Sequence, residues 1–137
     1  MGLHGGTPGS FVAAKHSLGG ERILIAALVL FSVPRETTLA QMTEAFEQSA
    51  PRFSGMPGLL AKHYLFDGND RGGAFYLWSS REHANAVFDE NWKESLKQRY
   101  GSPPRLWIFE VPVTVLNPKE IDKDQQASIT QLASDEF

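Results

Sequence analysis

The sequence has 137 residues, of which 42% are hydrophobic and 21% charged, values typical of one globular domain rather than a disordered or fibrous chain. Its formal net charge is -3 and it has no dense run of lysine and arginine, which argues against nucleic acid as a partner. The absence of cysteine excludes disulfides, zinc–thiolate sites and a cysteine nucleophile, and is compatible with a cytoplasmic location.

The N-terminal residues 1–21 are rich in glycine and show no periodicity, so we expect a flexible tail. The apolar run 23–33 that follows has the length of a signal-peptide core, but the leader before it is long and weakly charged, and no A-x-A cleavage pattern follows. The run is also too short to span a bilayer. We therefore interpret it as a buried strand and expect no membrane partner.

A helix is predicted after this strand, because Thr38 and Gln41 form a capping box and apolar residues then recur at helical spacing until Gly55 and Pro57. Residues 58–67 are predicted to be a second strand. The turn "GNDRGG" (68–73) is rich in residues that tolerate a left-handed backbone, and a third strand follows it up to residue 78.

A second helical region is predicted from a capping box of Ser79 and Glu82. Residues 89–91 interrupt it, and Asn91 with Glu94 caps a further segment that ends at Gly101. Residues 105–116 are predicted to form a fourth strand. The polar residues 117–137 are expected to be a C-terminal tail, partly helical.

The order strand, helix, strand, strand, helix, strand predicts an α+β domain over residues 22–116 with the ferredoxin-like fold, in which both helices lie on one face of a four-stranded antiparallel sheet. The third strand, "AFYLW" (74–78), is apolar on both of its faces. Because two helices cover only one face, the other would expose a large apolar patch. We therefore expect a homodimer in which the two sheets pack together, forming a dimeric α/β barrel.

The stretches "MPGLLAKHYLFDGNDRGGAFYLWSSREHA" (56–84) and "ENWKESLKQRYGSPPRLWIFEVPVTV" (90–115) resemble the YdhR-type monooxygenases. That family belongs to the dimeric α/β-barrel superfamily, which also contains antibiotic-biosynthesis monooxygenases. The resemblance covers residues 23–116 and implies a pocket between the sheet and its own helices. It further implies a cofactor-independent monooxygenase, or a related enzyme, that acts on an aromatic or polyketide-like substrate. Shared fold does not establish shared chemistry.

A cofactor-free oxygenase needs an apolar pocket, a base and hydrogen-bond donors. The expected pocket residues are four aromatic side chains: Tyr76, Trp78, Trp92 and Tyr100. The expected base is His83, which the positive end of a helix would keep neutral, or His63 on the second strand.

Each of these residues also has a purely structural interpretation. The aromatic side chains are equally suited to a core or a dimer interface, His83 to an exposed helix start, and His63 to a packed position. The corresponding function is non-catalytic binding of a hydrophobic ligand by the same homodimer. Haem is not expected, because Val87 and Phe88 stand where haem-degrading relatives carry the iron ligand. The histidines show no paired metal-ligand spacing, so we expect neither a metal nor another cofactor.

Overall fold

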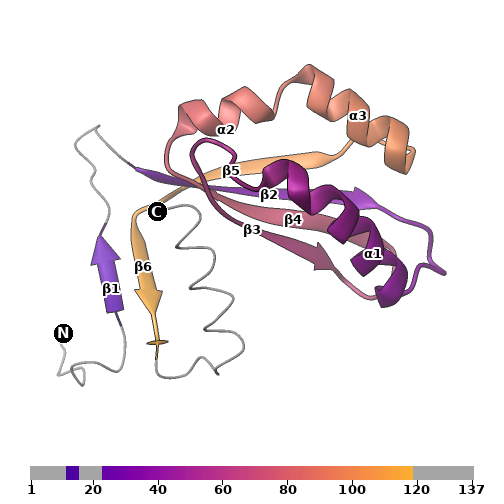
Figure 1. Cartoon of the computed structure of the whole chain (residues 1–137), viewed down its shortest axis with the longest axis horizontal. Helices are drawn as coiled ribbons and strands as arrows, with labels where there is room; N and C mark the ends of the chain where they lie inside the picture. Colours follow the sequence, from indigo (N-terminus) through magenta and orange to yellow (C-terminus); the bar gives the residue numbers. More distant parts are fainter. Residues whose placement is uncertain (1–11, 16–22, 119–137) are drawn as a thin grey trace.

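The computed structural model of the chain describes residues 12–15 and 23–118. Its elements follow the order β1 (Val12–Lys15), β2 (Leu24–Ser32), α1 (Leu39–Ser49), the 3-10 helix η1 (Ala50–Phe53), β3 (Leu59–Phe66), β4 (Arg71–Trp78), α2 (Arg81–Val87), α3 (Glu90–Tyr100), β5 (Arg105–Val111) and β6 (Val113–Leu116). Strands β3, β4, β2 and β5 form an antiparallel sheet in that order. The predicted ferredoxin-like α+β fold is therefore confirmed (Figure 1).

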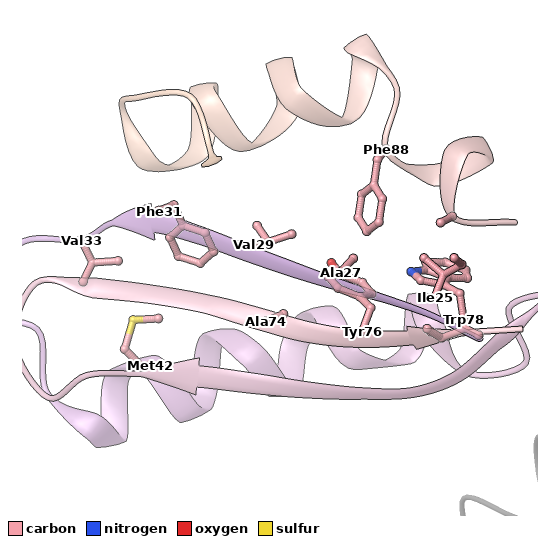
Figure 2. Packing of buried hydrophobic residues seen from close by; sticks show 12 residues of the cluster. Ile25, Ala27, Val29, Phe31, Val33, Met42, Ala74, Tyr76, Trp78 and Phe88 are labelled. Carbon is pink, nitrogen blue, oxygen red and sulfur yellow. The ribbon is translucent and has the colours of Figure 1, made fainter. Parts of the chain in front are cut away.

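One face of this sheet carries the hydrophobic core. Alternate residues of β2 (Ile25, Ala27 and Val29) are almost completely buried, and their partners across the sheet on β4 include Tyr76 and Trp78. Figure 2 shows Phe88, from the turn between α2 and α3, pointing down onto this row of side chains. Because core residues from the helices meet only this face, the helices and the sheet form two layers.

The helix ends follow the predicted capping chemistry with small shifts. Thr38 caps α1 with the full capping box, as predicted, and Gly101 ends α3 in a left-handed conformation with φ 88°. The cap of α2 is Ser80 rather than Ser79, and Asp89 rather than Asn91 caps α3. In both cases a neighbouring side chain that also accepts hydrogen bonds takes the position.

The helix predicted to run up to Gly55 is shorter than expected. Helix α1 stops at Ser49, and the chain tightens into η1, which has Pro51 in its first turn. A proline lacks the N–H group that an α-helix would need there, but it fits the first turn of a new helical segment. This break matters for the site, because it places Arg52 and Phe53 beside the sheet edge formed by β3.

One strand lies outside the expected domain, and the last expected strand is divided in two. Residues 12–15, which we expected to belong to a flexible tail, form β1 and pair antiparallel with β6, in a two-stranded ribbon that Figure 1 shows beside the main sheet. The strand predicted over residues 105–116 is divided at Pro112 into β5 and β6, because proline cannot donate to a sheet ladder. The remainder of both expected tails lies outside the described residues.

Candidate functional site

A cavity of about 480 Å³ lies between the sheet and the helices, a size suited to a small organic ligand. Its floor is the helix-facing side of β2, β3 and β4, and its walls come from α1, η1, α2 and α3. Most of the lining is apolar or aromatic: Val29, Phe31, Phe46, Phe53, Met56, Gly73, Ala74, Tyr76, Val87, Trp92, Leu96 and Tyr100. The remaining lining residues are polar or cationic: Ser49, Arg52, Lys62, Tyr64, Asn91, Ser95 and Arg99.

Small residues in the middle of the sheet leave room for this cavity. Val29 and Ala74 are cross-strand partners, and both lie on the floor. Larger rings stand around them: Phe31 stacks on Tyr100 with centroids 3.9 Å apart, and Tyr76 packs edge-to-face against Phe53 at 6.0 Å. The cavity therefore has aromatic walls above a floor of short side chains, which suits a flat apolar ligand.

Lys62 is the polar centre of the cavity. It pairs with Tyr76 in the β3–β4 register, so its side chain rises from the floor on the helix side of the sheet. Its ammonium lies over three rings, at 3.3 Å from the centroid of Phe53, 4.2 Å from Tyr64 and 4.8 Å from Tyr76. Such cation–π contacts compensate part of the cost of removing a cation from water.

Burial, followed by the charges of Arg52 and Arg99, lowers the pKa of Lys62 from 10.5 to about 7. Loss of water and the two nearby guanidinium charges both disfavour the charged form of the Lys62 amine. Near neutral pH the amine is therefore divided between its charged and neutral forms. A neutral amine in an apolar cavity is able to accept a proton or attack a carbonyl carbon, whereas the charged form binds anions.

Two tyrosines complete the polar part of the lining. The Tyr64 hydroxyl shares a hydrogen bond of 2.5 Å with the hydroxyl of Ser49 on α1, and burial raises the pKa of Tyr64. Burial, with the neighbouring Tyr64, also raises the pKa of Tyr76, which is 3% exposed. Both phenols are therefore neutral hydrogen-bonding groups at physiological pH.

Three of the four predicted pocket residues line this cavity: Tyr76, Trp92 and Tyr100. The fourth, Trp78, is not part of the lining. It is fully buried, stacked on Tyr76 at 5.9 Å and packed edge-to-face against Phe88. Its indole Nε1 is buried without a hydrogen-bond partner in the described part of the chain. Trp78 thus supports the cavity wall from behind, as a core residue.

Neither predicted base lies in the cavity. His83 is exposed on the first turn of α2, where its Nδ1 lies 2.7 Å from the Ser80 hydroxyl. Its ring also packs against Gly58, where a Cβ atom would overlap it. His63 is exposed and neighbours Phe75 at 6.5 Å, on the sheet face away from the helices. Both remain candidate bases by prediction only, and neither lines the cavity.

Lys62 and Arg52 are functional candidates that the sequence interpretation missed, whereas Arg99 could be placed at the pocket mouth from the sequence. The pattern contained a usable signal: Lys62 is a cation in the middle of an apolar strand, two positions from Tyr64 and therefore on the same face. Its relation to Tyr76 depends on the β3–β4 register, which has an irregularity between Leu59 and Ala61. That irregularity turns Leu59 toward Trp78 and the core, whereas simple alternation placed Leu59 on the face of His63.

Two other kinds of feature, a metal centre and a membrane-spanning helix, are absent from the described residues. Residues 12–15 and 23–118 contain no group of three or more histidine, aspartate or glutamate side chains placed to hold a metal ion. Among the same residues, no helix is long and apolar enough to cross a membrane. The cavity around Lys62 is the candidate functional site.

Comparison with known proteins adds information about the fold. No family model matches the sequence, and no curated protein matches it. A solved structure, the NE2512 protein of unknown function from Nitrosomonas europaea, is similar with a TM-score of 0.51 and 18% sequence identity, covering 68% of this chain and 92% of that chain. An identity this low shows the fold alone.

Proposed function

We propose that the protein binds an aromatic small molecule in the cavity between its sheet and helices. The observation that carries this proposal is the cavity itself, with a volume of about 480 Å³ and walls formed by Phe31, Tyr76, Trp92 and Tyr100. Enclosure by rings on several sides favours a flat, apolar ligand body. A few polar groups at one part of the lining, above all Lys62, would fix its orientation.

Binding is tested by titrating 1-naphthamide, a neutral aromatic probe, into the protein and following heat or tryptophan fluorescence. Ser95 is exposed on α3 and lines the cavity, so Ser95→Trp narrows the cavity without changing the core. We expect this variant to lose the probe. The control Lys97→Trp, on the exposed part of the same helix and outside the lining, should bind normally. Equal loss in the two variants would refute the proposal, as would a failure of the unmodified protein to bind either 1-naphthamide or its anionic analogue 1-naphthoate.

A catalytic role is the second candidate, and one observation favours it: an amine with a pKa of about 7 stands inside an aromatic cavity. We propose that neutral Lys62, rather than His83 or His63, takes a proton from an activated aromatic substrate. This is the step that cofactor-independent oxygenation of a polyketide-like substrate requires, as the resemblance to the YdhR-type monooxygenases suggests. Arg52 and Arg99 would stabilise the resulting anion.

This chemistry is tested by oxygen uptake with anthrone- and quinol-type substrates. We expect Lys62→Met to abolish uptake, and His83→Ala, His63→Ala and Lys97→Met to retain it. Tight binding without turnover of any substrate would leave a non-catalytic binding protein. The cysteine-free composition is the reason for proposing that it acts in the cytoplasm.

We also propose that two copies pack through the sheet face away from the helices, as the apolar pattern of β4 suggested. Phe75 and Phe109 on that face are 37% and 52% exposed, and Leu28, Leu30 and Trp107 lie partly exposed among them. A second copy would bury this surface, giving the dimeric α/β barrel.

A further inference from the structure

The cavity has an unbalanced charge. Three cationic side chains line it, Lys62, Arg52 and Arg99, and the described lining contains neither aspartate nor glutamate. This imbalance stands out in a chain whose formal net charge is -3. Elsewhere in the described chain four cations, Arg35, Arg71, Arg81 and Lys93, each have a carboxylate within ion-pair distance (Asp70, Asp67, Glu110 and Glu90, respectively), whereas Lys97 and Arg105 do not.

The three cavity cations lack such partners. Within the described part of the chain, the side chains of Lys62, Arg52 and Arg99 form no ion pair and donate no hydrogen bond. The cation–π contacts of Lys62 satisfy its charge only in part, since ring faces accept no ordinary hydrogen bond from its three N–H donors. The positive charges of Arg52 and Arg99 also repel the Lys62 ammonium, so a positive charge on all three groups at once is unfavourable.

The cations also have a defined position relative to the aromatic walls. Arg52 and Arg99 are exposed, so they stand at the solvent side of the cavity, on η1 and α3, whereas Lys62 lies deeper on β3. The hydroxyls of Ser49 and Tyr64, 2.5 Å apart, add hydrogen-bonding groups beside Lys62. A negatively charged ligand group near Lys62 would find an ammonium, two guanidinium groups and two hydroxyls around it.

We infer that the ligand of this cavity is an aromatic acid bound as its anion, with its negative group beside Lys62 and its ring between the aromatic walls. This inference rests on the proposed function and narrows its ligand class. An anion supplies the counter-charge that the lining lacks, and burying it costs little net free energy only because several donors replace its water. The ring contributes the apolar contact that a free inorganic anion would lack.

The test compares 1-naphthoate with 1-naphthamide, which share one ring system and differ mainly in charge. Isothermal titrations are made at pH 6.5, with the unmodified protein, Lys62→Met and the control Lys97→Met, whose side chain lies outside the lining. We expect the unmodified protein and the control to prefer naphthoate by about tenfold or more, in line with a charge-assisted hydrogen bond. In Lys62→Met we expect this preference to vanish, because the variant loses far more affinity for naphthoate than for the uncharged naphthamide.

A second variant, Arg99→Gln, tests the same point at an exposed position where folding is not at risk. It should weaken naphthoate binding severalfold and reduce its dependence on salt concentration, with a smaller effect on naphthamide. Equal affinities for the two probes in the unmodified protein would overturn the inference and leave the proposed function standing. Binding of neither probe would overturn both. Loss of both probes in Lys62→Met would also overturn the inference, because the lysine would then act through the shape of the cavity.

Discussion

The ammonium of Lys62 lies 3.3 Å from the centre of the Phe53 ring, which joins the middle of strand β3 to the 3-10 helix η1. This contact holds a cation at the apolar wall of the cavity, where its pKa is lowered to about 7. A lysine in such surroundings is maintained at a cost to stability, and residues of that kind are concentrated at functional sites. The contact therefore makes predictions about stability as well as about binding.

We predict that Lys62→Met stabilises the fold at pH 7 by about 1–2 kcal/mol, because methionine fills similar space without a charge to desolvate. The gain should shrink as the pH rises. The folded-state pKa of Lys62, about 7, lies below its ordinary value of 10.5, so between these values the unfolded chain holds more protons. The free energy of unfolding of the unmodified protein then rises with pH.

Urea denaturation at pH 6.5, 7.5, 8.5 and 9.5 measures this effect. The slope from Lys62 is at most about 1.4 kcal/mol per pH unit, and the variant should lack it. Lys97→Met, at an exposed position of α3, serves as the control and should follow the unmodified protein. Parallel profiles for the unmodified protein and Lys62→Met would show that Lys62 titrates normally.

The same lysine predicts a pH dependence for the binding of an aromatic anion. A bound anion favours the charged amine, so naphthoate binding above pH 7 should take up about one proton, and the affinity should fall by up to about tenfold per pH unit. The arginines keep their charge in this range, and the pKa values of Tyr64 and Tyr76 are raised. Lys62 is therefore the cavity group expected to titrate here.

Calorimetric titrations at pH 8 in phosphate and in Tris buffer measure the proton directly, because the observed heats differ by the ionisation enthalpies of the buffers. Binding to Lys62→Met should take up no proton, so its observed heat should be the same in both buffers. An affinity for naphthoate that is constant from pH 6.5 to pH 9 would contradict the assignment of the anion to Lys62.

The contrast between Lys62 and the histidines shows what local sequence could and could not predict. Capping residues such as Thr38 and Gly101 act within a few positions of the chain, so the helices, the four strands of the main sheet and their order followed from the sequence. The cavity depends instead on residues brought together from β3, η1 and α3, and on the irregularity near Leu59. Histidine was the expected base because the ordinary pKa of its side chain lies near neutral pH. The pKa of Lys62 reaches that range only because of its burial and these neighbours.

Gly58 and His83 provide a test of the structural role of that histidine. Gly58 has φ 79°, and a Cβ atom there would overlap the His83 ring. Gly58→Ala should lower the free energy of unfolding by about 2–4 kcal/mol, combining left-handed strain with overlap. Adding His83→Ala should remove the overlap, so that the double variant loses only about 1 kcal/mol of unfolding free energy, from the left-handed strain. Thermal or urea unfolding of the two single variants and the double variant measures the coupling.

His83→Ala alone should leave the binding of 1-naphthamide unchanged, since His83 lies outside the cavity lining. Strictly additive effects in this cycle would refute the packing role. Loss of oxygen uptake in a folded His83→Ala variant would instead restore the histidine as the candidate base.

The apolar residues on the outer face of the sheet lead to a prediction about the oligomeric state of the protein. Phe109 on β5 is 52% exposed and pairs with Ala26 of β2, on the face away from the helices. A glutamate there would place a charge inside an interface between two sheets, which costs several kcal/mol if unpaired. We therefore expect Phe109→Glu to convert a dimer into a monomer, measured by size-exclusion chromatography with light scattering, with an unchanged circular dichroism spectrum. Leu39→Glu replaces another exposed apolar residue, 69% exposed on α1, and should leave the dimer intact. A monomeric unmodified protein at micromolar concentration would rule out this interface, and the apolar outer face would then need a different covering partner.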